Sequence, residues 1–199
     1  MTLAYIVRCN FNREDLEQSW NEWYGGPKLK QMLDKPYFLS VQRFFKSSGA
    51  GRNYVAFWIL ESQEAFETPE YKNDWGFFEW RPYIIDWSRD LFAPLSGDVR
   101  SPVLDDAQAL RLVSFEGLSA EEAAAAKLQV EARRPGVKWM RSVGLDKHTP
   151  LIGYEVVDAN APDKPLDVAG VVEGLYRPIT ELVHADETAG QSPAGEGRA

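Results

Sequence analysis

The chain has 199 residues, enough for one medium domain or two small ones, and its formal net charge is −8. Nucleic acid and anionic membranes bind clustered Lys and Arg, so neither is expected as a partner. No apolar run reaches the roughly eighteen residues that span a bilayer, and the first residues lack a signal-peptide pattern. Cys9 is the only cysteine, which is typical of a reducing compartment, and the sequence predicts a cytoplasmic protein.

The first half of the chain alternates strand and helix patterns. Residues 3–9 form an apolar strand pattern, and Asn12 is predicted to cap a helix that follows. Gly25-Gly26-Pro27 stops or kinks this helix, and residues 28–33 resume it. The remaining predicted elements are strands at 37–46, 54–60 and 83–92, with a helix capped by Ser62 before the last strand. The order is β-α-β-β-α-β, the ferredoxin-like unit.

The second half repeats this order in a reduced form. Residues 94–106 are polar and turn-rich and are predicted to be a linker. Ser119 and Glu122 form a capping box for the helix that follows. The predicted elements are strands at 109–115, 137–145, 151–158 and 174–183, a helix at 121–134, and a compressed second helix at 162–172. The tail, residues 186–199, has the composition of a disordered segment.

We therefore predict an α+β fold of two ferredoxin-like repeats, at residues 1–93 and 107–185. A ferredoxin-like sheet carries helices on one face and leaves the other bare and apolar, so this face must be covered. Two such sheets in one chain can cover each other and enclose a cavity between them. A homodimer through the outer strands stays possible.

The stretch WNEWYGGPKLKQMLDKPYFLSVQRF, residues 20–44, resembles the signature of the dimeric α+β-barrel superfamily, particularly its EthD-like catabolic members. YVAFWILESQEAFETPEYK, residues 54–72, resembles the next strand and helix of the same families. The resemblance covers residues 3–92, and 108–185 only as a pattern. It implies this barrel fold, but the superfamily includes isomerases, lyases, monooxygenases, haem enzymes and binding proteins. Many relatives carry a His where this chain has Gly25-Gly26, so acid-base chemistry on that His is not available here.

The interrupted helix raises two interpretations. Trp20, Trp23 and Tyr24 lie on one helical face immediately before the break. Either the helix bends to pack around a sheet, or the break shapes the entrance of a pocket. In the second case the phenol of Tyr24 could act as an acid or as an oxyanion donor.

Polar residues inside apolar strands are the other catalytic candidates. Arg43 lies in a predicted buried strand and needs a carboxylate, either from the protein or from a ligand. Asp86 lies in the apolar run YIIDW, where desolvation would raise its pKa, although it could also pair with Arg89. Arg89 and Arg177 occupy matching positions in the closing strands of the two halves.

The candidates for substrate binding are aromatic residues and one amide, Gln42. The predicted binding residues are Trp20, Gln42, Trp58, Trp75, Trp80 and Trp87. His148 and His184 are isolated in the sequence and make a poor metal or haem site. No nucleotide or flavin motif is present, so we predict chemistry by side chains, without a metal or cofactor.

The sequence thus predicts a cofactor-independent lyase or isomerase. Its substrate would be a small, mostly apolar aromatic or carbonyl compound, with Asp86 or Tyr24 moving a proton and an arginine stabilising oxyanion charge. One alternative is a cofactor-free monooxygenase, in which an electron-rich substrate reacts with oxygen. Another is a non-catalytic binding protein, which a filled space between the sheets would favour.

Overall fold

The strands form where apolar and β-branched residues recur, and the helices begin at polar caps. The computed structural model describes residues 1–160 and 165–188. Its strands are β1 (Leu3–Phe11), β2 (Phe38–Gly49), β3 (Tyr54–Leu60), β4 (Ile84–Pro94), β5 (Gln108–Ser114), β6 (Lys138–Leu145), β7 (Leu151–Asp158), β8 (Val172–Pro178) and β9 (Val183–His184). Its helical segments are α1 (Glu14–Trp23), η1 (Tyr24–Lys28), α2 (Leu29–Leu33), η2 (Gln63–Phe66), α3 (Pro69–Lys72), η3 (Phe78–Tyr83), α4 (Ala120–Glu131) and α5 (Ala185–Thr188).

Eight strands of the described chain close into an antiparallel barrel. Their order is β3-β1-β4-β6-β7-β5-β8-β2, and β2 pairs back with β3. The first half contributes β2-β3-β1-β4 and the second half contributes β6-β7-β5-β8. The halves join through the β4–β6 and β2–β8 pairs, and β9 extends the edge of β2. Closure leaves these eight strands without an open edge.

Alternation along the strands separates the core inside the barrel from an outer core on each half. In β1, Ala4 and Ile6 point into the barrel, whereas Tyr5 and Val7 point outward under the helices. Side chains from all eight barrel strands fill the interior: Ala4, Ile6, Phe44, Val55, Phe57, Ile59, Phe92, Leu110, Leu112, Met140, Ile152, Tyr154 and Tyr176. The barrel centre is therefore a packed core.

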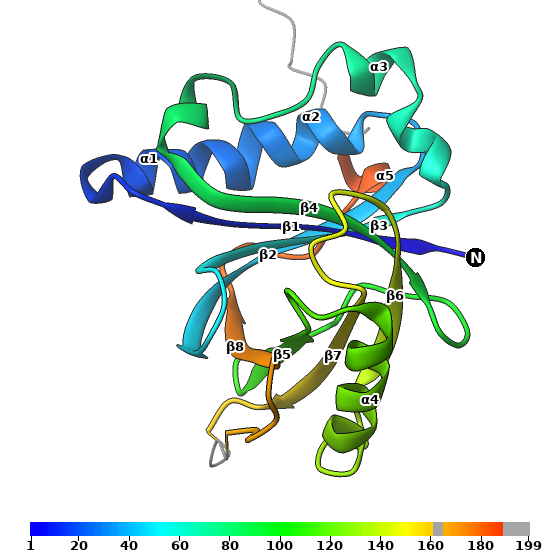
Figure 1. Ribbon diagram of the computed structural model, residues 1–199. Coiled ribbons are helices and arrows are strands. Elements are labelled where there is room, and N and C mark those ends of the chain that lie inside the picture. The colour runs from blue at the N-terminus through cyan, green and yellow to red at the C-terminus, as the bar shows by residue number, and fades with distance from the viewer. Residues whose placement is uncertain (161–164, 189–199) are drawn as a thin grey trace, which may run out of the picture.

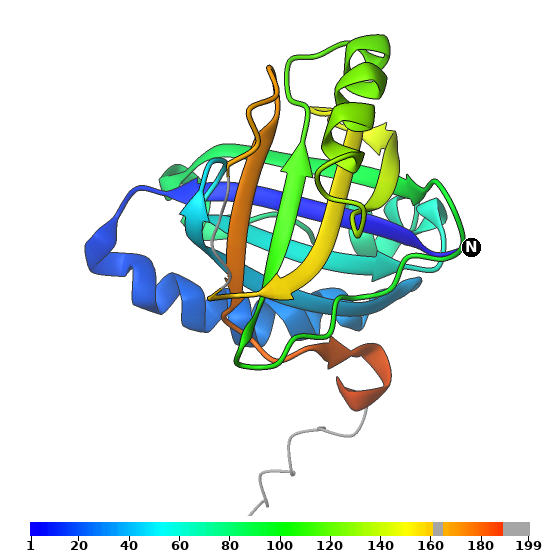
Figure 2. The same ribbon diagram turned by 90° about the horizontal axis from the view of Figure 1, so that it is seen from below.

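The helices form outer layers on the two halves. The continuous segment α1-η1-α2, together with α3, covers the outer face of the first-half sheet (Figure 1). Helix α4 covers the second half, where Phe115 stacks on Trp139 (Figure 2). The structure is thus an α+β barrel with one well-covered face and one lightly covered face.

Most predicted strands and the capping box at Ser119 are confirmed, but the helices differ. Helix α1 begins after Arg13 without a side-chain cap, so the prediction for Asn12 is wrong. Ser62 caps only the short η2, and Thr68 caps α3. The Gly25-Gly26-Pro27 break does not end the helix, because η1 carries the chain from α1 into α2 as one π-helical turn.

The second half has a simpler connection than the first. The predicted helix at 162–172 is absent from residues 165–171, and residues 161–164 lie outside the described part. The predicted disordered tail begins one residue after the start of α5, whose four residues are helical. Residues 189–199 lie outside the described part.

Candidate functional site

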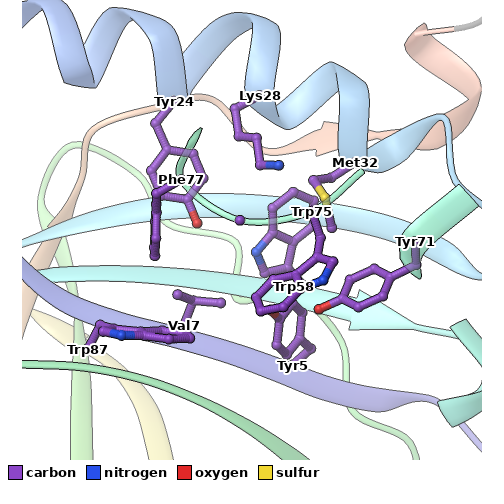
Figure 3. Close-up of a pocket in the computed structure, with 11 residues that line it drawn as sticks. Tyr5, Val7, Tyr24, Lys28, Met32, Trp58, Tyr71, Trp75, Phe77 and Trp87 are labelled. Atoms are coloured by element: carbon purple, nitrogen blue, oxygen red, sulfur yellow. The ribbon is translucent and has the colours of Figure 1, made fainter. Parts of the chain in front are cut away.

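A cavity lies between the outer face of the first-half sheet and the helices above it. The space in it that a water molecule can occupy is about 30 Å³. Its lining residues are Tyr5, Val7, Tyr24, Lys28, Met32, Trp58, Tyr71, Trp75, Gly76, Phe77 and Trp87 (Figure 3). Strands β1, β3 and β4 supply the floor, the η1-α2 segment supplies the roof, and the segment before η3 closes one side.

The predicted position of the cavity is wrong. We expected it between the two sheets, but large apolar side chains from both halves meet there and fill the barrel. The residues on the opposite face of the same strands, Tyr5, Val7 and Trp58, line the actual cavity. Side chains alternate between the two faces of a strand, so the prediction named the right strands but placed the cavity on their inner face, whereas it lies on their outer face.

The π-helical turn explains how the broken helix serves the cavity. Trp20, Tyr24 and Lys28 are all buried on the face toward the sheet. The wider turn keeps Tyr24 and Lys28 on this face although Pro27 supplies no backbone N–H. Inserted π-turns often occur at functional sites. The break therefore places a phenol and an amine in the cavity roof.

Lys28 is the most unusual group in the cavity wall. The residue is 5% exposed. Its Nζ donates to Gln31 Oε1 at 2.9 Å and lies 4.8 Å from the Phe78 ring centroid. No carboxylate of the described residues lies within ion-pair distance of this amine. Burial lowers the pKa of Lys28 to about 8, while the charge of Asp74 partly opposes this shift. The amine can therefore gain and lose a proton near neutral pH.

A hydrogen-bond chain links this amine to the protein surface. Gln31 accepts from Lys28 and donates through Nε2 to both Asp74 carboxylate oxygens at 2.7 Å. Lys35 donates to Asp74 Oδ2 at 3.1 Å, and this bond lowers the pKa of Asp74. Asp74 precedes Trp75 and Gly76, so the chain also fixes one side of the cavity.

Three phenols complete the polar part of the cavity. Burial raises the pKa of Tyr24 and Tyr5 well above the usual value, and it also raises the pKa of Tyr71. All three hydroxyls are therefore protonated at neutral pH and can donate a hydrogen bond. Figure 3 shows the Tyr24 hydroxyl pointing into the cavity from the side of Lys28.

Two predicted arginines border the cavity without lining it. Arg89 donates to the Tyr71 hydroxyl at 3.3 Å and lies 4.2 Å from the Trp75 ring centroid. Arg43 lies behind Tyr24, 1% exposed, and donates to the side chain and the backbone carbonyl of Asn21. Each arginine therefore contacts an aromatic residue of the cavity wall from outside the cavity: Arg89 contacts Trp75, and Arg43 contacts Tyr24.

Other predicted residues lie outside the cavity. The burial predicted for Asp86 is wrong: its side chain is 59% exposed and pairs with Arg52 at 3.3 Å. Asp86 has a φ of 48°, and a register shift between β1 and β4 nearby turns it off the strand pattern. The predicted pairing of Asp86 with Arg89 is not found, and Arg177 binds the Asp106 carbonyl at 2.9 Å.

The predicted aromatic set divides into two groups. Trp58, Trp75 and Trp87 line the cavity. Trp20 stacks on Phe11 in the adjacent core, and Trp80 packs beside it. Gln42 does not line the cavity and donates to the Thr180 carbonyl at 3.1 Å.

Sequence reasoning missed Lys28, Tyr5, Tyr71 and Phe77. A signal for Lys28 exists, because it follows Tyr24 and Trp20 at successive intervals of four residues on the apolar face. Tyr71 and Phe77 come from short segments without periodicity, and only the fold brings them beside β1 and β3.

The described residues contain no group of three His, Cys, Asp or Glu side chains arranged to hold a metal ion. Within the same residues, no helix has the length and apolar character needed to cross a membrane. Cys9 is buried in the outer core, and burial raises the pKa of its thiol to about 12.

Comparisons with solved structures show the fold. No protein-family model and no curated protein matches the sequence. An anthrone oxidase-like protein is similar with a TM-score of 0.65 and 11% identity, over 97% of this chain and 96% of that chain. A candidate monooxygenase from Lactobacillus acidophilus has a TM-score of 0.51 and 14% identity, over 93% of this chain and 97% of that one. Another, from Fusobacterium nucleatum, has a TM-score of 0.50 and 13% identity, over 92% and 93%.

These neighbours share the α+β-barrel architecture, which confirms the fold at that level. They also correct the predicted reaction. The neighbours are named for oxidative chemistry, and none of the three is named as a lyase or isomerase. The prediction of a lyase or isomerase is therefore contradicted, and the neighbours agree better with the monooxygenase alternative.

Proposed function

We propose that this protein is a cofactor-free oxygenase of small, flat, electron-rich aromatic compounds such as phenols or anthrones. The observation that carries the proposal is the Lys28 amine, which shares a cavity with aromatic rings and protonated phenols. The names of the structural neighbours, an anthrone oxidase-like protein and two candidate monooxygenases, support the same chemistry.

The reaction needs no external reductant. The neutral amine of Lys28 takes a proton from an activated C–H group of the substrate, and the electron pair spreads into the aromatic system. Dioxygen accepts this electron density and forms a C–O bond, and the resulting peroxide takes a proton. Breaking the O–O bond and the second C–H bond releases water and leaves a carbonyl. For an anthrone the balance is CH₂ + O₂ → C=O + H₂O. A phenol loses its O–H proton in place of the first C–H proton and gives a quinone, which for 1-naphthol is C₁₀H₈O + O₂ → C₁₀H₆O₂ + H₂O.

The cavity residues divide this work. Lys28 moves the proton and, once protonated, stabilises the anion that it has formed. Tyr24 donates a hydrogen bond to the developing phenolate or enolate oxygen. Trp58, Trp75 and Trp87 provide flat apolar surfaces that bind the ring and exclude water. The carboxylate of Asp86 has no part in this arrangement.

Oxygen uptake tests the proposal. Chelator-treated protein is mixed with anthrone or 1-naphthol in an oxygen electrode, and products formed under ¹⁸O₂ are analysed by mass spectrometry. We expect protein-dependent uptake of one O₂ per substrate and one labelled oxygen in the product. Lys28→Met should reduce the rate about 10²- to 10⁴-fold. Lys72→Met, at an exposed lysine, should leave the rate unchanged. Equal rates in wild type and Lys28→Met would refute the role of Lys28.

A non-catalytic binding protein is the second candidate. From the sequence we expected a filled space between the sheets to favour a binding protein, and the barrel interior is filled. The cavity under the helices could bind an aromatic ligand without turnover. Saturable quenching of tryptophan fluorescence by the same compounds, with no oxygen uptake, would favour this candidate.

The two halves of the chain have similar strand orders. We infer that the two halves are copies of one ferredoxin-like unit, the second without its second helix. The matching strand orders, β2-β3-β1-β4 and β6-β7-β5-β8, support this relation. The boundaries at residues 93 and 107, the EthD-like resemblance and a homodimer stay predictions.

A further inference from the structure

The Lys28 amine has the surroundings of a nucleophile. It lies among apolar and aromatic side chains, is 5% exposed, and has the neutral Gln31 amide as its hydrogen-bond acceptor. Figure 3 shows the side chain directed into the cavity between Tyr24 and Met32. A desolvated lysine without a carboxylate partner is the type of amine that reacts with carbonyl compounds.

We propose that the cavity is a covalent site for aromatic aldehydes and ketones, which Lys28 binds reversibly as an imine. This inference uses the same cavity as the proposed oxygenase but does not depend on oxygen chemistry. Its ligands would be flat aromatic carbonyl compounds, and the side chains around Lys28 must move apart to admit one, because the open space is about 30 Å³.

The covalent step balances without a further reagent. The amine nitrogen attacks the carbonyl carbon, the C–N bond forms, and the former carbonyl oxygen gains a proton to give a carbinolamine. The C–O bond then breaks and water leaves, so the sum is R–NH₂ + O=CR₂ → R–N=CR₂ + H₂O. Tyr24, whose hydroxyl points into the cavity, can supply the proton for the departing oxygen.

The cavity favours the imine over the free reactants in two ways. Its aromatic walls, Trp58, Trp75 and Phe77, bind the ring of the ligand and hold its carbonyl near the amine. Its burial excludes water, which would hydrolyse the imine. Two other lysines lack this setting: Lys72 is exposed and pairs with Glu67 at 2.7 Å, and Lys35 pairs with Asp74.

Reductive trapping tests this inference. The full-length protein is incubated with 2-naphthaldehyde and cyanoborohydride, which converts an imine into a stable secondary amine, and the modified lysines are identified by peptide mass spectrometry. We expect Lys28 to be modified at least about tenfold faster than Lys72, because burial lowers the pKa of Lys28 to about 8 and the cavity holds the ring beside this amine. Lys28→Arg should lose this modification, and Lys72→Met should keep it. 2-Naphthylmethanol, which cannot form an imine, should slow the trapping by competing for the cavity.

The inference is overturned if Lys28 is modified no faster than Lys72, or if the alcohol has no effect on the rate. If Lys28→Arg fails to fold, the ratio of the two lysines in the wild type still decides. Oxygen uptake on the same preparation separates the two proposals. Uptake without trapping removes only the imine site, and trapping without uptake removes only the oxygenase.

Discussion

The guanidinium carbon of Arg43 lies 4.2 Å from the ring centroid of Tyr24, directly behind the cavity roof. Arg43 also donates to the Asn21 carbonyl at 3.2 Å and to the Asn21 side chain at 2.8 Å. Asn21 lies in the last turn of α1, just before the helix widens. Arg43 thus joins the sheet to the π-helical turn that presents Tyr24 and Lys28.

The first prediction is that Arg43 stabilises this turn and does not set the proton chemistry. Arg43→Met should lower the free energy of unfolding by about 2 kcal/mol, because hydrogen bonds and cation–π contacts are lost. The pH at which Lys28 titrates should stay near 8. Urea unfolding and the pH profile of oxygen uptake measure the two effects. A shifted profile at unchanged stability would contradict this role.

The second prediction concerns the pH dependence of stability. Burial lowers the pKa of Lys28 to about 8, from 10.5 in the unfolded chain. Between these values the unfolded chain binds the additional proton, so the free energy of unfolding rises with pH. Below pH 8 the folded chain bears the full cost of the buried charge. Lys28→Met should therefore be more stable than wild type at pH 7, by up to about 3 kcal/mol.

Thermal unfolding at a series of pH values checks this expectation. The difference in unfolding free energy between wild type and Lys28→Met should narrow as the pH rises from 8 toward 10.5. Lys72→Met, where the side chain is exposed, should show no such trend. A constant difference across this range would mean that Lys28 keeps an ordinary pKa.

The third prediction is that Asp74 tunes Lys28 through Gln31. The negative charge of Asp74 raises the pKa of Lys28, against the effect of burial. Asp74→Asn should therefore lower this pKa further and move the rise of the oxygen-uptake rate to lower pH, by less than about one unit. Glu67→Gln, which breaks an exposed ion pair, is the control and should leave the profile in place. An unchanged profile in Asp74→Asn would show that the hydrogen-bond chain is only structural.

The sequence predicted most strands, because the eight barrel strands have seven or more residues and carry apolar side chains that pack on neighbouring strands. Local spacing could not predict which face of a strand meets a cavity. Tyr5 and Ile6 are adjacent and both buried, yet Ile6 lies in the barrel core and Tyr5 lines the cavity. That choice depends on how tightly the two halves fill the barrel, which is a property of the whole fold.

Two candidate residues show where local reasoning fails. Asp86 belongs to an apolar run, but the irregular pairing of β1 with β4 turns its side chain outward. Lys28 is polar and adjacent to Pro27, which usually marks a surface turn, yet the π-helical turn keeps it on the buried face. In both cases a local irregularity, a register shift for Asp86 and a π-helical turn for Lys28, decides which way the side chain faces.

The fourth prediction tests the glycine pair of the π-helical turn. Apart from its chain neighbours and the backbone of its own helix, a Cβ atom at Gly26 would meet no atom within 4 Å, whereas one at Gly25 would lie 3.2 Å from Thr180 Cγ2. Gly26→Ala should therefore stabilise the protein by about 0.5–1 kcal/mol through helix propensity. Gly25→Ala should gain less or lose stability, because Thr180 must move. Thermal unfolding of both variants gives the comparison, and equal stabilisation would show that the contact with Thr180 has no effect.

The fifth prediction concerns the charged cluster at one end of the barrel. Arg8 donates to Asp90 at 2.9 Å and to Glu116, and the Asp90 side chain is fully buried. Arg8→Met would leave the Asp90 charge without its arginine and should cost about 3–5 kcal/mol. Removing the charge as well, in Arg8→Met/Asp90→Asn, should recover part of this loss. Arg13→Met, in an exposed pair with Asp15, should leave the free energy of unfolding unchanged. Urea unfolding of Arg8→Met, Asp90→Asn, the double variant and Arg13→Met measures the coupling energy between Arg8 and Asp90. If the losses of the two single variants add up to the loss of the double variant, the two buried charges do not stabilise each other.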